Sequence, residues 1–163
     1  MLNDGEIAAI FDALPQLSRS NALMVRILLA TGTRIGELAQ AEWRHVNFEA
    51  AEWTIPPEHS KNKKAFMIPL VPMVAGWFAD LQAMSFGSRY VLPIRCRNHG
   101  TEGDAPMVTT TLNAALDGLT KSLGDKCRRF TPHDLRSTMR SHLGMLGVDV
   151  LIAERCLNHS LGG

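Results

Sequence analysis

The chain has 163 residues, 45% of them hydrophobic and 20% charged, a composition typical of a globular domain with a buried core. No apolar run is long enough to cross a bilayer, and the formal net charge of +1 does not by itself indicate a nucleic-acid partner. The charge is uneven, however, because residues 1–60 have a net charge of −4 and residues 89–140 one of +4. This asymmetry is compatible with a basic face for a polyanion, or with solvated surface charge that serves no partner.

Apolar residues recur at helical spacing in the first part of the chain. They predict one helix over residues 4–14 and a second over residues 20–31, which Gly32 should end. Thr33 is then expected to cap a short helix over residues 34–41.

The middle of the chain changes to short runs rich in β-branched and aromatic residues, separated by polar turns. These runs predict a small antiparallel sheet with strands over residues 46–48, 53–55 and 66–70. Residues 58–64 would form a long hairpin tip, and helical spacing returns over residues 74–84.

The last part of the chain is again mainly helical. Residues 90–92 favour another short extended piece, and residues 95–106 a polar loop. Helical spacing predicts a helix over residues 112–123, another that begins after Thr131, and a last one over residues 149–157. The fold class predicted is α+β, a mainly helical domain with a small three-stranded antiparallel sheet.

The segment Thr131-Pro132-His133-Asp134-Leu135-Arg136 has the signature of a helix start. Thr131 reads as the N-cap and Asp134 completes a capping box, while proline suits the first helical position. His133 and Arg136 are three residues apart, so they should share a helix face. A helix N-terminus favours anions, so an arginine fork and an imidazole there predict a phosphate pocket. The alternative is a capped helix with two solvated polar residues.

Three further cationic or imidazole side chains are candidates for the same chemistry. Arg34 is expected just inside a helix start, where Glu37 could orient its guanidinium from behind. Lys61 lies at the hairpin tip, where its ammonium could reach a phosphate or donate a proton. His159 follows the last predicted helix. Taken singly, each could equally be a surface or capping group.

The cysteines and glycines give little sign of a cofactor. Cys96, Cys127 and Cys156 are widely spaced, which fits reduced thiols in a cytoplasm better than a disulfide framework. Cys96 and His99 form a lone Cys-x-x-His pair that could belong to a zinc site, but no clear second pair lies nearby. No glycine loop of the nucleotide-binding type is present, so we expect neither a metal nor another cofactor.

Taken together, the motifs resemble the catalytic domain of the tyrosine recombinases, also called phage integrases. The resemblance covers essentially the whole chain and is greatest to prophage and genomic-island integrases. It depends on the order and spacing of TGTRIGEL, then SKNKK before a strand that ends in IPL, then TPHDLR and LNHS. By this resemblance five residues match the family's active-site positions: Arg34, Lys61, His133, Arg136 and His159.

The resemblance also implies a mechanism. The family cuts DNA through a covalent bond between a tyrosine and the 3′-phosphate, and then reverses that step with a new strand. Arg34 and Arg136 would clamp the non-bridging phosphate oxygens, and His159 would add a hydrogen bond. Lys61 would protonate the leaving 5′-oxygen, and His133 would assist proton transfer or positioning. Such preorganised cations stabilise the doubly negative pentacoordinate transition state more than the ground state.

The partner implied is double-stranded DNA at attachment sites, bound in the family by tetramers in the cytoplasm. Four basic residues are candidates for contacts to the DNA backbone, or else idle surface charges: Lys63, Lys64, Arg128 and Arg129.

The sequence departs from the family pattern at three places. The nucleophilic tyrosine is expected shortly after the position of His159, whereas the one tyrosine here, Tyr90, precedes TPHDLR. The family usually carries an N-terminal domain that clamps DNA, and many relatives have a polar residue near the position of Phe66. We therefore expect residues 1–163 to be one catalytic domain, truncated at both ends and unable to cleave DNA alone. The alternative is a non-catalytic DNA-binding module or regulator that retains the fold.

Overall fold

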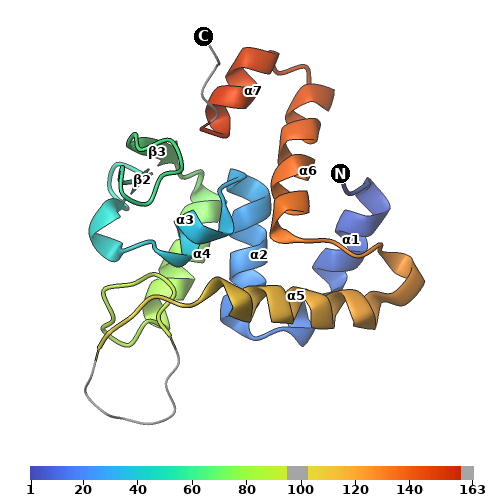
Figure 1. Cartoon of the computed structure of the whole chain (residues 1–163), viewed down its shortest axis with the longest axis horizontal. Coiled ribbons are helices and arrows are strands. Elements are labelled where there is room, and N and C mark those ends of the chain that lie inside the picture. The colour runs from blue at the N-terminus through green and yellow to red at the C-terminus, as the bar shows by residue number, and fades with distance from the viewer. Residues whose placement is uncertain (95–102, 159–163) are drawn as a thin grey trace. The chain divides into compact units, whose positions relative to one another are not determined.

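The structure, a computed structural model, describes residues 1–94 and 103–158. The chain forms two compact units (Figure 1). The first combines Met1–Ile35 with Thr110–Gly163, and the second is Gly36–Thr109. Each unit buries a set of apolar side chains of its own.

The first unit is helical. Its elements are α1 (Asp4–Ala13), η1 (Leu14–Gln16), α2 (Arg19–Thr31), α5 (Thr109–Leu123), η3 (Gly124–Lys126), α6 (Pro132–Met145) and α7 (Val150–Cys156). Helices α2 and α6 pack side by side (Figure 1). The apolar stripes of α2, α5 and α6 supply buried side chains that include Leu23, Ile27, Leu28, Leu116 and Leu135. Residues distant in sequence therefore share one core, as helical periodicity predicts.

Helix α2 has a clear start and a clear end. The Ser18 side chain accepts a hydrogen bond from the backbone N–H of Asn21 at 3.3 Å and so caps the first turn. Gly32 ends the helix with a φ of +63°, in the left-handed region. A residue with a Cβ atom is disfavoured there, so glycine suits this position. The prediction that Gly32 ends this helix is confirmed.

The second unit contains the sheet. Its elements are α3 (Ile35–Ala39), η2 (Trp43–His45), β1 (Val46–Asn47), β2 (Glu52–Ile55), β3 (Phe66–Pro69) and α4 (Pro72–Ala83). The three strands are antiparallel in the order β1-β2-β3. Val46 pairs with Trp53, and Ile55 pairs with Phe66.

Strand β2 alternates between buried and half-buried residues, the period expected when one face of a sheet covers a core. Trp53 and Ile55 are its buried residues. Helix α4 supplies Phe78, whose ring centroid lies 5.4 Å from that of Trp53 in a tilted arrangement. Offset aromatic pairs of this kind add to the stabilisation that comes from burial. The strand predictions for the middle of the chain are thus confirmed in number and direction.

Two details differ from the sequence expectations. Helix α3 has five residues, fewer than the predicted span of 34–41. Tyr90 joins Glu42 in an isolated bridge and does not extend into a strand, although Val91 still donates a backbone hydrogen bond to Ala41 at 2.9 Å. This hydrogen bond and the one from Trp43 to the Arg89 carbonyl, also 2.9 Å, flank the single bridged pair.

Among residues 1–94 and 103–158, no helix is both long and apolar enough to cross a membrane. Over the same residues, no group of three or more histidine, cysteine or acidic side chains is placed to hold a metal ion. The Cys96–His99 pair lies outside the described residues. Cys127 is a buried free thiol and Cys156 an exposed one.

Candidate phosphate-binding site

The start of α6 has the capping box that the sequence predicts. The Thr131 side chain accepts a hydrogen bond from the Asp134 backbone N–H at 3.3 Å. In return the Asp134 carboxylate accepts from the Thr131 backbone N–H at 2.9 Å and from its hydroxyl at 2.8 Å. Pro132 occupies the first turn. These contacts fix the direction in which α6 leaves its N-terminus, and so they fix where its side chains point.

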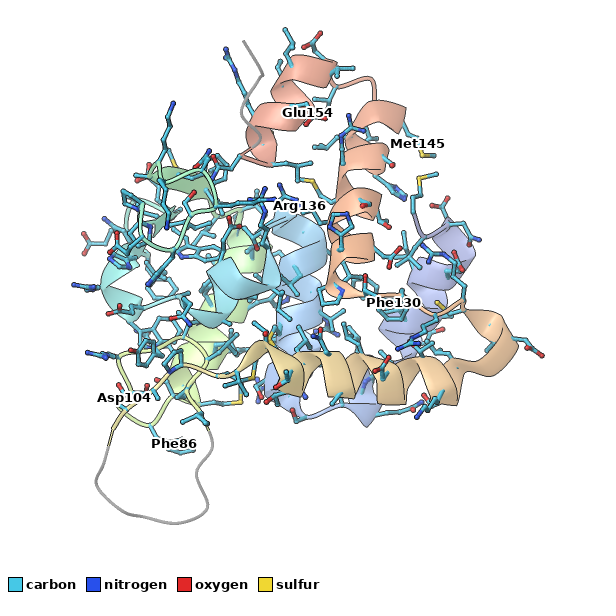
Figure 2. The ribbon with its side chains drawn as sticks, viewed as in Figure 1. Phe86, Asp104, Phe130, Arg136, Met145 and Glu154 are labelled. Atoms are coloured by element: carbon cyan, nitrogen blue, oxygen red, sulfur yellow. The ribbon has the colours of Figure 1, made fainter. Side chains whose placement is uncertain are left out.

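Arg136 lies in the second turn of α6 and is only 5% exposed. Its guanidinium donates one hydrogen bond to the carbonyl of Gly32, at the end of α2, and another to the carbonyl of Leu157, at the end of α7 (Figure 2 labels Arg136). A buried guanidinium bound to two carbonyls is held in one plane, because its N–H donors form a rigid fork. Arg136 is therefore a fixed cation on which three helices converge.

The two carbonyl contacts bring separate motifs together. Arg34 follows Gly32 by two residues, and His159 follows Leu157 by two residues. Two residues of extended chain reach at most about 7 Å, so the backbone that leads to Arg34 starts beside the Arg136 guanidinium. Arg34 itself is half-buried, whereas His159 lies outside the described residues.

The segment that leads to Arg34 is held by a pair of hydroxyl groups. Thr31 and Thr33 are buried, and their side-chain oxygens lie 2.9 Å apart. Thr31 also donates to the carbonyl of Ile27 at 2.7 Å. Sequence reasoning assigned only Thr33 a role, as a helix cap, and missed this pair. Glu37 is buried in the second unit, so its support of the Arg34 guanidinium stays a prediction.

His133 and Arg136 lie in different environments although they are three residues apart on α6. His133 is exposed and Arg136 is buried. Helical spacing gives the angular position of a residue, but burial also depends on which neighbouring elements cover that turn. Here the ends of α2 and α7 contact Arg136, one turn further along the helix.

Lys61 is exposed in the second unit, between β2 and β3. The turn around it is ordered by its neighbours, because the Ser60 hydroxyl donates to the Asn62 side chain at 2.7 Å. The same Asn62 oxygen accepts from the Lys64 backbone N–H at 3.2 Å. Lys63 has a φ of +58° and is exposed, as is Lys64. The predicted DNA contacts of Lys63 and Lys64 stay predictions.

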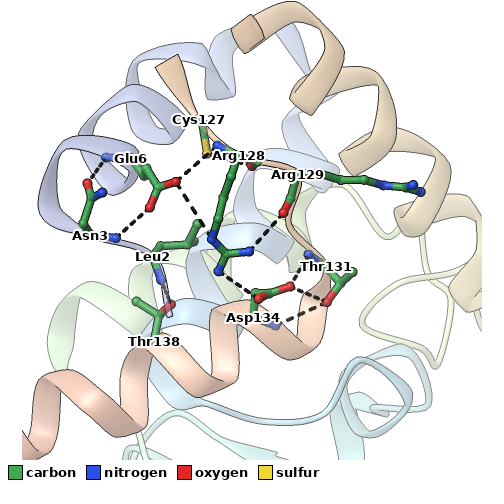
Figure 3. A network of polar contacts seen from close by, with 9 residues as sticks. All are labelled: Leu2, Asn3, Glu6, Cys127, Arg128, Arg129, Thr131, Asp134 and Thr138. Atoms are coloured by element: carbon green, nitrogen blue, oxygen red, sulfur yellow. Dashed lines mark hydrogen bonds and ion pairs between the residues drawn. The ribbon is translucent and has the colours of Figure 1, made fainter. Parts of the chain in front are cut away.

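Arg128 and Arg129, also candidates for DNA contacts, both have carboxylate partners. Arg128 lies 2.9 Å from Asp134, and its backbone N–H donates to Glu6 at 3.2 Å (Figure 3). Arg129 lies 3.0 Å from Asp117 on α5. Sequence reasoning missed Glu6 and Asp117, because neither lies near its arginine in a recognisable motif.

The Asp134 carboxyl makes the stability of the start of α6 depend on pH. Burial raises the pKa of Asp134, but hydrogen bonds from Thr131 and Arg128 outweigh that effect and hold the pKa below its ordinary value. The Asp134 carboxyl therefore has a lower pKa in the folded protein than in the unfolded chain. The ionised carboxylate stabilises the fold fully above the pKa of the unfolded chain, and this stabilisation is lost as the pH falls through the pKa of the folded protein.

We predict that Asp134→Asn lowers the free energy of unfolding at neutral pH, and that the gap from the native chain narrows on acidification. Urea titrations from about pH 7 down to about pH 3, the range in which carboxyl groups titrate, would measure both. The pKa of Glu6 is also lowered, mainly by the hydrogen bond from the Asn3 backbone. The stability of the variant should therefore still fall to some extent on acidification. A gap that stays constant with pH would contradict the assignment to Asp134.

The fold and this site define a class: a mainly helical domain with a small sheet, in which a buried arginine near the start of one helix binds the carbonyls at the ends of two others. The sequence model of the Phage integrase family matches residues 1–162, and the chain belongs to that family. The family resemblance predicted from the motifs is thereby confirmed.

Curated relatives agree with this assignment. The chain is 30% identical to prophage integrase IntA of Escherichia coli (strain K12), over 91% of this chain and 36% of that protein. It is 24% identical to tyrosine recombinase XerA of Pyrococcus furiosus, over 98% of this chain and 53% of that protein. The chain thus spans between about a third and about half of these relatives' lengths.

Solved structures share the fold. The lambda integrase catalytic core is similar with a TM-score of 0.75 and 18% identity, over 99% of this chain and 92% of that one. XerH site-specific recombinase bound to difH substrate is similar with a TM-score of 0.74 and 17% identity, over 98% of this chain and 47% of that one. The predicted α+β fold class is confirmed.

Proposed function

We propose that this chain is the catalytic domain of a tyrosine recombinase of the prophage or genomic-island type. The protein would cut and rejoin double-stranded DNA at specific sites through a 3′-phosphotyrosine intermediate. The observation that carries the proposal is the pair of hydrogen bonds from Arg136 to the carbonyls of Gly32 and Leu157. They support a common centre for the family's motifs, because Gly32 belongs to TGTRIGEL, Arg136 to TPHDLR and Leu157 to LNHS.

Electrostatic stabilisation is the main chemical role of such a centre. As an oxygen nucleophile attacks phosphorus, the phosphoryl group gains a second negative charge. Arg34 and Arg136 would bind its non-bridging oxygens, and His159 would add a hydrogen bond. Rigid tethering of Arg136 favours the transition state over the ground state, because the cation needs no reorganisation at the moment of attack.

Proton transfer completes the reaction. The tyrosine hydroxyl loses its proton to a base, its oxygen forms a bond to phosphorus, the bond to the 5′-oxygen breaks, and that oxygen takes up another proton. We assign its delivery to Lys61 as general acid, with His133 in support of proton transfer or positioning. Rejoining reverses each step with the 5′-hydroxyl of a new strand, so bond energy is retained and no nucleotide cofactor is needed.

Tyr90 is poorly suited to be the nucleophile. It is buried in the second unit, and its hydroxyl oxygen accepts a hydrogen bond from Arg89 at 2.6 Å. We therefore assign the nucleophile to a tyrosine outside these 163 residues, so this chain alone would bind a phosphate without cleaving DNA. A tetramer on DNA is the proposed working assembly, since one similar structure is a lambda integrase tetramer bound to a Holliday junction.

We predict that the full-length protein containing this chain forms a covalent adduct with duplex DNA from its attachment site, in the presence of a metal chelator. The adduct survives denaturation, so a denaturing gel with labelled DNA detects it. The 163-residue chain should bind the same DNA and form no adduct. DNA binding by the full-length protein without any adduct would overturn the proposal and favour a non-catalytic DNA-binding module.

A further inference from the structure

Two helices of the first unit begin with reciprocal capping boxes. At α1 the Asn3 side chain accepts from the Glu6 backbone N–H at 2.9 Å, and the Glu6 carboxylate accepts from the Asn3 N–H at 2.9 Å. At α6 Thr131 and Asp134 make the equivalent pair. Each box satisfies backbone donors that an uncapped helix start leaves without partners.

Arg128 links the two boxes (Figure 3). In each carboxylate one oxygen serves its own cap and the other serves Arg128. Glu6 binds Asn3 through Oε2 and the Arg128 backbone N–H through Oε1. Asp134 binds Thr131 through Oδ2 and the Arg128 guanidinium through Oδ1 at 2.9 Å.

The remaining contacts of Arg128 hold the segment that leads into α6. Its guanidinium donates to the Arg129 carbonyl at 3.0 Å, and its Nε lies 3.9 Å from Glu6. An isolated surface ion pair contributes little, but one side chain that joins two caps and a carbonyl has few alternative geometries. The first turn of α6 is therefore tied to the first turn of α1.

A second tie lies one turn further along α6. The backbone N–H of Leu2 donates to the Thr138 hydroxyl at 2.8 Å, and both residues are fully buried. The two ties bracket Arg136, since Asp134 precedes it and Thr138 follows it by two residues each. The start of α1 thus fixes α6 on both sides of the residue that gathers the phosphate-binding motifs.

We propose that Arg128 is a positioning residue for the site on α6, and that its ion pairs serve this role instead of a contact to the DNA backbone. The inference rests on the proposed recombinase function for its catalytic readout only. Arg128 acts through Asp134 and Glu6 and touches no reacting atom. Its loss should loosen the first turn of α6, and a small displacement of catalytic groups has a large effect on rate.

The test compares Arg128→Gln, Arg128→Lys and the matched control Arg44→Gln in the full-length protein. Arg44 lies in the second unit, and its variant removes the same charge from an ion pair with Glu42 at 2.9 Å. Three quantities are measured: the single-turnover rate of adduct formation, the dissociation constant for duplex DNA as a function of salt, and hydrogen exchange of the α6 amides.

Arg128→Gln should slow adduct formation by about tenfold or more, with an unchanged slope of affinity against salt. The backbone amides of Asp134 and Leu135 should exchange faster, while those of α2 keep their protection. Arg128→Lys should recover part of the rate, because an ammonium can still pair with one carboxylate. Arg44→Gln should leave the rate and the α6 exchange unchanged.

In a plot of the logarithm of DNA affinity against the logarithm of salt concentration, the slope for Arg128→Gln could decrease in magnitude by about one while hydrogen exchange in α6 is unchanged. That result would identify a phosphate contact and overturn the inference. The inference would also be overturned if Arg128→Gln formed the adduct at the same rate as an active native protein. Should the native protein form no adduct at all, the proposed function fails, and the exchange data still decide whether Arg128 holds the start of α6.

Discussion

Arg136→Lys should lower the rate of adduct formation by the full-length protein by about 10²- to 10³-fold, the usual effect of losing one preorganised transition-state donor. Lysine keeps the positive charge but loses the planar fork. A single ammonium cannot hold the Gly32 and Leu157 carbonyls in the geometry that the guanidinium gives them. Single-turnover kinetics at saturating DNA would measure the effect without a contribution from binding.

The same substitution should also affect folding. A buried carbonyl without a partner costs about 1–3 kcal/mol, so the free energy of unfolding of the 163-residue chain should fall by that amount. Because the substitution changes both the rate of adduct formation and the free energy of unfolding, the rate must be measured well below the melting temperature of the variant. At that temperature the fraction of folded protein is near one, and the rate reports the site alone.

Arg140→Lys is the matched control. Arg140 lies one turn after Arg136 on the same helix, but it is exposed and pairs with Glu154. The control should keep its adduct rate within about twofold and its stability within about 0.5 kcal/mol. Equal losses in the two variants would mean that Arg136 has no special role and that the site is wrongly centred.

Local signals allowed much of this fold to be predicted. The capping box at Thr131 and Asp134 is written in four consecutive residues, and Gly32 ends a helix because of its own backbone freedom. The strands were found because β-branched and aromatic runs alternate with polar turns. The four short motifs, of which TPHDLR contains Arg136, also indicated the family, because their order and spacing can be read from a single sequence.

Long-range pairing could not be predicted in the same way. The Arg128 contact to Glu6 spans 122 residues, and the Leu2 contact to Thr138 spans 136. Nothing in the local pattern around Arg128 distinguishes a lysine or arginine that meets DNA from one that meets a carboxylate. Burial of Arg136 likewise depends on the ends of α2 and α7, which periodicity within α6 cannot reveal.

Gly32→Ala should lower the free energy of unfolding by about 2–5 kcal/mol, because two costs combine. The left-handed backbone, with a φ of +63°, costs an L-residue about 1–2 kcal/mol. A Cβ atom would also lie 2.5 Å from Leu157 Cδ2 and 3.0 Å from Met139 Sδ, and such overpacking costs about 1–3 kcal/mol. Both neighbours are flexible side chains, so the backbone term should be the more constant of the two.

Gly36→Ala, four residues later, is the control for this prediction. A Cβ atom there meets nothing within 4 Å, and the residue lies in helix α3. Alanine is the better helix former, so this variant should be unchanged or more stable by up to about 1 kcal/mol. Urea unfolding of the 163-residue chain would measure both variants. Equal stability of Gly32→Ala and the native chain would show that neither the left-handed end of α2 nor its close approach to Leu157 constrains this position.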